Sequence, residues 1–149
     1  MNIAQLSIGT AMSTPDWFQV TQKIVNDFAD VTGDFQWIHL DQQRCATESP
    51  FRTTIAHGFL TAALMPQMFA KCVSIDASRY TMLNYGIDGL RYLESVRVDD
   101  KIRFGFSLTE IEQKPTGKLH RFATHVEIEG RDKPALVGEF LMLLIENPA

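Results

Sequence analysis

Residues 58–75 read GFLTAALMPQMFAKCVSI, and this run decides how the rest of the chain must be arranged. It is too long for an ordinary strand, and its apolar residues fall on almost every side of a helix, so we expect a helix buried nearly all round. Pro66 interrupts the run, and because proline lacks a backbone donor it predicts a kink there. The apolar residues of the run are Phe59, Leu60, Ala62, Ala63, Leu64, Met65, Met68, Phe69 and Val73.

The segments after this helix change to a period of two, which is typical of strands with one buried face. Apolar residues alternate within 83–92, where a slip at Gly89 predicts a bulge, and again within 102–108 and 122–128. Residues 135–146 are apolar on both parities, which predicts a central strand covered on both faces. One buried helix followed by antiparallel strands indicates an α+β protein whose sheet wraps the helix, the arrangement of the hot-dog fold.

Upstream of the buried helix, we expect a shorter helix that is followed by two polar residues. Thr21 is expected to cap this helix, and Gly33 stands where a left-handed residue is needed to end it. Asp34 and His39 follow. A carboxylate and an imidazole in one cleft can hold a water molecule and transfer protons at neutral pH. The spacing alone favours a structural role for both residues, because an Asp after a helix and a half-buried His are common.

Gly58 adds a third element at the predicted start of the buried helix. Free backbone N–H groups and the positive end of the helix dipole converge at such a start, and a glycine lets a substrate carbonyl approach them. An acid and base pair beside a donor for a developing oxyanion has the parts needed to hydrate an α,β-unsaturated thioester. The structural alternative is that Gly58 only opens the helix and His57 caps it.

The composition limits the remaining classes of function. A chain of 149 residues is expected to form one domain over residues 1–149. Its net charge is −4 and its basic residues are scattered, so we expect neither a nucleic-acid partner nor a membrane surface. Cys45 and Cys72 lie outside any metal-binding spacing, and no export signal or membrane span is evident. A reduced cytoplasmic protein without a metal ion or disulfide bond is the expectation.

Several motifs resemble a known family. The stretches FADVTGDFQWIHLD (28–41) and TTIAHGFLT (53–61) are similar to the signature of the MaoC-like (R)-specific enoyl-CoA hydratases. The pair Gln36-Trp37 resembles the branch typified by the nodulation protein N type, whereas the wider family more often has Asn-Pro at these positions. The likeness continues through GLRYLESVRVDDKIRF (89–104) and GRDKPALVGE (130–139), so it covers essentially the whole chain.

This resemblance implies a chemistry and an assembly. Asp34 and His39 match the family's catalytic residues, which hold the water that adds to a trans-2-enoyl-CoA, and Gly58 matches the glycine whose amide polarises the thioester carbonyl. Coenzyme A then enters as part of the substrate, and no separate cofactor or metal ion is expected. Protomers of the family pair into dimers with a continuous sheet, with coenzyme A near the interface, so a homodimer or an assembly of dimers is expected.

The residues around the reactive positions are expected to shape the substrate pocket. Gln36 and Trp37 replace the family's usual pair without altering either reactive position, and His57 directly precedes Gly58, so we expect all three to line the pocket. We also expect the bulky run 35–38 to make the medium drier, which strengthens electrostatic interactions.

Two other functions stay open. A hot-dog acyl-CoA thioesterase also needs a carboxylate-activated water, aimed at the thioester carbon, and release of a free thiol distinguishes it from a hydratase. A non-catalytic acyl-thioester-binding protein would keep the same residues for structural reasons. Elsewhere we expect surface or edge positions for His120 and His125, and packing roles for the two cysteines.

Overall fold

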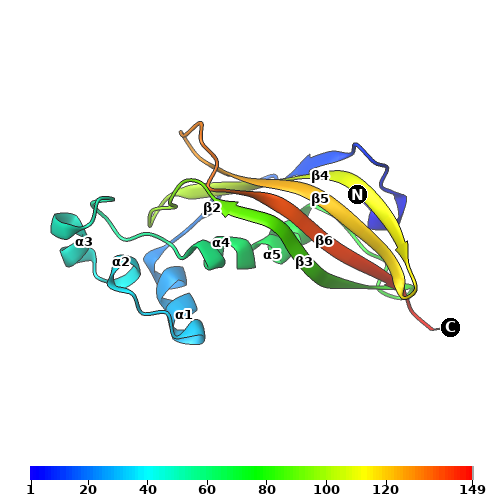
Figure 1. Cartoon of the computed structure of the whole chain (residues 1–149), viewed down its shortest axis with the longest axis horizontal. Helices are drawn as coiled ribbons and strands as arrows, with labels where there is room; N and C mark the ends of the chain where they lie inside the picture. Colours follow the sequence, from blue (N-terminus) through cyan, green and yellow to red (C-terminus); the bar gives the residue numbers. More distant parts are fainter. Residues whose placement is uncertain (149) are drawn as a thin grey trace.

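A computed structural model describes residues 1–148 and shows an antiparallel sheet curved over two consecutive helices (Figure 1). The strands are β1 (Ala11–Ser13), β2 (Phe18–Gln19), β3 (Tyr80–Tyr92), β4 (Lys101–Lys114), β5 (Gly117–Ile128) and β6 (Leu136–Glu146). The helices are η1 (Ile3–Gln5), α1 (Gln22–Thr32), α2 (Trp37–Leu40), α3 (Gln42–Glu48), α4 (Gly58–Ala63) and α5 (Met65–Cys72). The predicted α+β class, with a sheet wrapped on a buried helix, is confirmed.

The order of strands places β6 inside the sheet and leaves β3 at one edge. Neighbouring strands run β1-β4-β5-β6-β3, and β2 also pairs with β4. The prediction of a central strand at residues 135–146 is therefore confirmed. The register of β3 against β6 shifts between Asp88 and Arg91, and Gly89 within that interval has a φ of 58°. Because such a φ suits glycine, the predicted bulge is confirmed as well.

The core forms between the inner face of the sheet and the two central helices. Phe69 of α5 is fully buried, and its ring lies 4.8–5.6 Å from the rings of three phenylalanines on β4, β5 and β6. Aromatic pairs at these separations add to the free energy of area burial. The residues of β4 and β5 that the alternation predicts to face inward are all buried: Ile102, Phe104, Phe106, Leu108, Phe122, Thr124, Val126 and Ile128.

Pro66 divides the central helix, as its position in the sequence predicts. Helix α4 ends at Ala63 and α5 begins at Met65, so the kink appears as a break at Leu64 with the proline in the first turn of α5. The expectation of burial all round is wrong for Phe59, which is 70% exposed, and for Ala63, which is exposed as well. The reason is that, within this chain, the sheet covers only one side of α4.

Helices α1, α2 and α3 gather together beyond the N-terminal end of α4 (Figure 1). The caps of α1 follow the prediction, since the Thr21 hydroxyl accepts a hydrogen bond from the N–H of Ile24 and Gly33 ends the helix with a φ of 77°. Within residues 1–148, no helix combines the length and apolar character that crossing a bilayer requires.

The expected surface position of His120 is wrong. His120 has the same parity on β5 as Phe122, faces inward and is only 2% exposed. The predicted position followed the polar residue type, although the period of two indicated the core. Burial lowers the pKa of the His120 imidazole below its ordinary value of 6.5.

This burial predicts a pH-dependent stability. The pKa values of His120 and His39 are both lowered in the folded state, so their contribution to stability is complete above about pH 6.5 and is lost as the pH falls below it. His120→Gln should therefore make the loss of unfolding free energy between pH 6.5 and 5 shallower, as measured by urea denaturation. His125→Gln, on the outer face, is the control, and equal slopes for both variants would contradict the prediction.

Candidate active site

The acidic residue of the site stands in the short connection between α1 and α2. Gly33 turns the chain out of α1, so that Asp34 follows directly and its side chain is 53% exposed. One carboxylate oxygen accepts a hydrogen bond from the N–H of Gln36 at 3.3 Å, which makes a local turn. The other oxygen faces the imidazole of His57 at 4.0 Å. Solvent thus reaches the carboxylate from one side, while the other side meets a buried ring.

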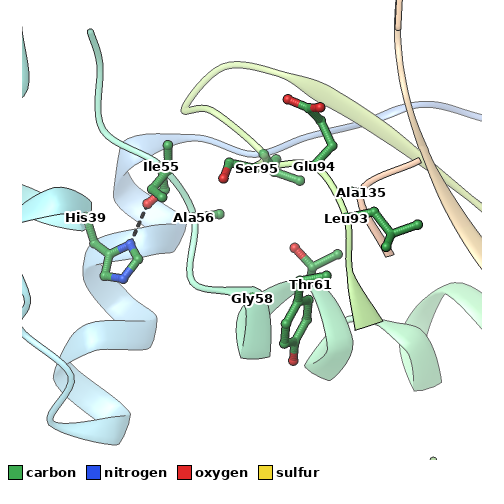
Figure 2. Close-up of a pocket in the computed structure, with 11 residues that line it drawn as sticks. His39, Ile55, Ala56, Gly58, Thr61, Leu93, Glu94, Ser95 and Ala135 are labelled. Atoms are coloured by element: carbon green, nitrogen blue, oxygen red, sulfur yellow. Dashed lines mark hydrogen bonds between the residues drawn. The ribbon is translucent and has the colours of Figure 1, made fainter. Parts of the chain in front are cut away.

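His39 lies on the single turn of α2 and is 6% exposed. Its Nδ1 lies 2.7 Å from the carbonyl oxygen of Ile55 (Figure 2). A carbonyl only accepts, so Nδ1 carries a proton and, in the neutral ring, Nε2 is a free acceptor. Burial is the main cause that lowers the pKa of His39, and the nearby His57 acts in the same direction. The ring is therefore neutral at pH 7.

Gln22 anchors the main chain of His39. Its side-chain amide donates to the carbonyl oxygen of His39 at 2.8 Å, and its own oxygen accepts from the hydroxyl of Thr54 and the amide of Gln42. Thr54 is fully buried. One glutamine at the start of α1 thus joins α2, α3 and the segment that leads into α4. Nothing in the local sequence pattern distinguishes Gln22 from the other glutamines, so the sequence analysis missed it.

His57 brings the acid and the imidazole together. Its ring stacks on the ring of His39, with centroids 3.8 Å apart and planes inclined by 24°. Its Nε2 lies 3.0 Å from the main-chain oxygen of Asp34. A carboxylate oxygen of Asp34 and one ring nitrogen from each histidine lie within 4.8 Å of one another. The side chains of Asp34 and His39 therefore lie close together, as the sequence predicts.

Gly58 begins α4 beside a cavity of about 220 Å³ (Figure 2). The first N–H groups of a helix have no partner within it, so the amide of Gly58 is available to a ligand. A Cβ at this position would lie 2.9 Å from the ring of Tyr92, so this contact requires glycine as long as the ring stays in place. The lining residues are His39, Ile55, Ala56, Gly58, Thr61, Tyr92, Leu93, Glu94, Ser95, Val96 and Ala135.

A second, open and apolar groove of about 440 Å³ lies on the other side of α4. Phe28 links this groove to the reactive pair, because it lines the groove and its ring lies 5.0 Å from that of His57, which stacks on His39. The groove runs between the helices and the edge strand β3. Its other lining residues are Phe59, Ala62, Ala63, Pro66, Asn84, Tyr85, Gly86, Ile87 and Phe140.

Gln36 and Trp37 lie outside the lining of both hollows. Trp37 packs under the guanidinium of Arg44 on α3, 4.0 Å from its ring centre, and Gln36 is exposed. A direct part in shaping the substrate pocket stays a prediction for both residues. Phe35 is 58% exposed, so in this chain it does not dry the site in the way the sequence analysis expects.

Asp34, His39 and His57 have the side-chain types of a metal site, but their rings are not arranged around one. Nδ1 of His39 donates to the carbonyl of Ile55, and Nε2 of His57 donates to the carbonyl of Asp34. Only the opposite ring nitrogens are then available as ligands. The two rings stack face to face, whereas ligands converge on an ion. The expectation that the site works without a metal ion stays a prediction.

The arrangement is well suited to hold a single water molecule. The carboxylate of Asp34 and Nε2 of a neutral His39 are both hydrogen-bond acceptors, and a carboxylate oxygen and a ring nitrogen of the two residues lie within 4.8 Å of each other. A water molecule has two O–H donors, and a bridge between acceptors less than 5 Å apart is sterically possible. Such a water would point an oxygen lone pair away from both residues. It would then be a nucleophile with a fixed direction, beside the start of α4.

Comparison with known proteins finds a matching family and several relatives of similar sequence. The family described as MaoC like domain matches residues 4–130. The 3-hydroxyacyl-thioester dehydratase Z of Mycobacterium tuberculosis is 40% identical over 135 residues, which cover 90% of this chain and 88% of that protein. Nodulation protein N of Rhizobium meliloti is 35% identical over 142 residues, covering 95% of this chain and 88% of that protein.

Solved structures agree with the fold. The unliganded R-hydratase PhaJ1 of Pseudomonas aeruginosa superposes with a TM-score of 0.78 and 26% identity, over 97% of this chain and 85% of that one. The (R)-hydratase from A. caviae, which is 22% identical, has a TM-score of 0.75 over 93% of this chain and 97% of its own. The hot-dog architecture expected from the sequence is confirmed.

The anchoring role of Gln22 predicts a loss of stability. Gln22→Leu would leave the buried hydroxyl of Thr54 and the carbonyl of His39 without their partner, so the free energy of unfolding should fall by about 1–3 kcal/mol in urea denaturation. Gln43→Leu, at an exposed position on α3, is the matched control and should change it by less than about 0.5 kcal/mol. Equal effects of the two changes would show that Gln22 is no anchor.

Proposed function

This chain belongs to the family of MaoC-like domains, and on that premise we propose that it adds water reversibly to trans-2-enoyl-CoA, giving (R)-3-hydroxyacyl-CoA. Relatives named as a 3-hydroxyacyl-thioester dehydratase and an R-hydratase support this type of reaction. The observation that carries the proposal is the approach of Asp34 and His39 to within 4.8 Å of each other beside the start of α4.

Asp34 and His39 have different roles toward the water. Asp34 acts as the base, and the neutral ring of His39 orients the water through Nε2 and shares its proton. The water oxygen forms a bond to the β-carbon of the substrate, while the π electrons of the double bond move toward the α-carbon and the thioester oxygen. A proton then returns to the α-carbon, so that H and OH are added overall.

The amide of Gly58 is the donor for the charge that develops on the thioester oxygen. An N–H group at a helix start faces this oxygen without reorganisation, and the helix dipole adds to the attraction. The thioester would then lie in the cavity between Gly58 and the segment 92–96. Besides His39, the polar side chains that line this cavity are Thr61, Tyr92, Glu94 and Ser95, and we expect them to contact the amides of the substrate rather than to take part in the chemistry.

The apolar groove between α4, α5 and β3 has the right chemistry for the acyl chain. It adjoins Phe28, which touches His57, so a chain placed there would begin next to the reactive pair. Coenzyme A is part of the substrate in this proposal, and no further cofactor is involved. The open edge of β3, with Leu83 and Tyr85 about half exposed, suits pairing with a second copy into a homodimer.

The reaction predicts strong effects at both reactive positions. Asp34→Asn and His39→Gln should each lower kcat for the hydration of crotonyl-CoA by about 10²- to 10⁴-fold, because an amide side chain cannot take up and return the proton of the water. The loss of enoyl absorbance measures the rate. Asp30→Asn, at an exposed position of α1, is the matched control and should retain the wild-type kcat.

Other outcomes would identify the other functions. Equal rates in wild type and both variants would refute the role of the pair. Release of free thiol from saturated acyl-CoA, with no hydration, would indicate a thioesterase. Binding of acyl-CoA without turnover over a panel of chain lengths would indicate a binding protein.

A further inference from the structure

His57 is the buried polar residue of the site to which the proposed reaction gives no task. It is 3% exposed and lies between two rings, stacked on His39 at 3.8 Å and tilted against Phe28 at 5.0 Å. The sequence analysis expected it to line the substrate pocket, but the lining of the cavity beside Gly58 does not include it. Its contacts are with the reactive residues themselves.

Within the described residues, the ring of His57 makes a hydrogen bond through Nε2 and none through Nδ1. Nε2 lies 3.0 Å from the main-chain oxygen of Asp34, so this nitrogen carries the proton, and Nδ1 is then a bare acceptor in a neutral ring. Among residues 1–148, Nδ1 is buried and has no hydrogen-bond partner. A leucine or phenylalanine would fill the same space without burying an unpaired acceptor. Packing alone therefore does not account for a histidine at this position.

We propose that His57 is the positioning residue of the reactive pair: its Nε2–H holds the main chain at Asp34, and its ring face supports the ring of His39. This inference rests on the proposed hydratase function. Asp34 stands in an exposed turn whose other contacts are local, and the bond to His57 is the link that ties this turn to the start of α4. The separation between the carboxylate and the His39 ring thus depends on His57.

The stacked rings also restrict protonation of His39. Positive charges on two rings with centroids 3.8 Å apart would repel each other, so the neighbouring His57 lowers the pKa of the His39 imidazole. The other groups near His39 are the Asp34 carboxylate and the carbonyl of Ile55, which both raise its pKa, and Glu94 across the cavity. Burial and His57 together outweigh them, and His39 keeps a free Nε2 for the water.

Two variants distinguish the role of the Nε2–H donor of His57 from the role of its aromatic ring. His57→Phe keeps an aromatic face but loses the N–H, so kcat for crotonyl-CoA should fall by about 10- to 100-fold with little change in KM, as expected for misplaced reactive groups. His57→Gln returns a donor near the position of Nε2 and should restore most of the lost kcat. In both variants the acid limb of the pH profile of kcat/KM should move to higher pH, since His39 no longer faces a second imidazole.

The control is His125→Gln, which changes a histidine on the outer face of β5 and should leave kcat and the pH profile unchanged. A purely structural role of His57 would lower the melting temperature of the variants but leave the acid limb where it is in the wild type. That result, or a wild-type kcat in His57→Phe, would overturn the inference.

Nitrogen NMR of the imidazoles in the wild-type protein gives a test that needs neither a folded variant nor activity. We expect a proton on Nε2 of His57 and on Nδ1 of His39, and a proton on Nδ1 of His57 instead would overturn the inference. If the wild type hydrates no enoyl thioester but these tautomers are found, the proposed function fails while the positioning geometry stands. If the wild type is active and the tautomer of His57 is the opposite one, only the positioning role fails.

Discussion

The contact between His39 and Ile55 is the constraint on which the site depends. The N–H of Ile55 donates to the carbonyl of Ile38 at 3.1 Å, and the carbonyl of Ile55 accepts from Nδ1 of His39 at 2.7 Å. The neighbouring Ala56 donates to Val96 at 2.8 Å, on the chain that joins β3 to β4. One short segment therefore fixes the tautomer of the imidazole and connects α2 to the chain between β3 and β4, two residues before α4 begins.

Much of this architecture follows from the sequence because local rules and tertiary packing agree. The caps at Thr21 and Gly33, the break at Pro66 and the inward residues of β4 and β5 all express preferences that a short stretch already contains. The approach of Asp34 to His39 was also predicted. Their five-residue spacing is spanned by a turn and one helical turn, which is too short to carry them far apart.

Other features depend on contacts between distant segments, which a pattern does not contain. Phe59 lies exposed because the sheet covers only one side of α4, and His120 lies buried although its residue type suggests the surface. The bonds of Gln22 to Thr54 and His39 join positions 32 and 17 residues apart. The stack of His57 on His39 also cannot be predicted without the fold, since neither residue is unusual in its own stretch of sequence.

The reactive groups and the apolar groove come from different parts of the chain. Asp34 and His39 lie on the turn and the short helix that follow α1, whereas the groove is built mainly from α4, α5, β3 and the inner face of β6. His57 and Phe28 are the residues through which the two parts touch. Changes along the groove can therefore alter which acyl chain fits without moving the acid and the imidazole. Changes at His57 act in the opposite way. They disturb the placement of Asp34 and His39 and leave the groove unchanged.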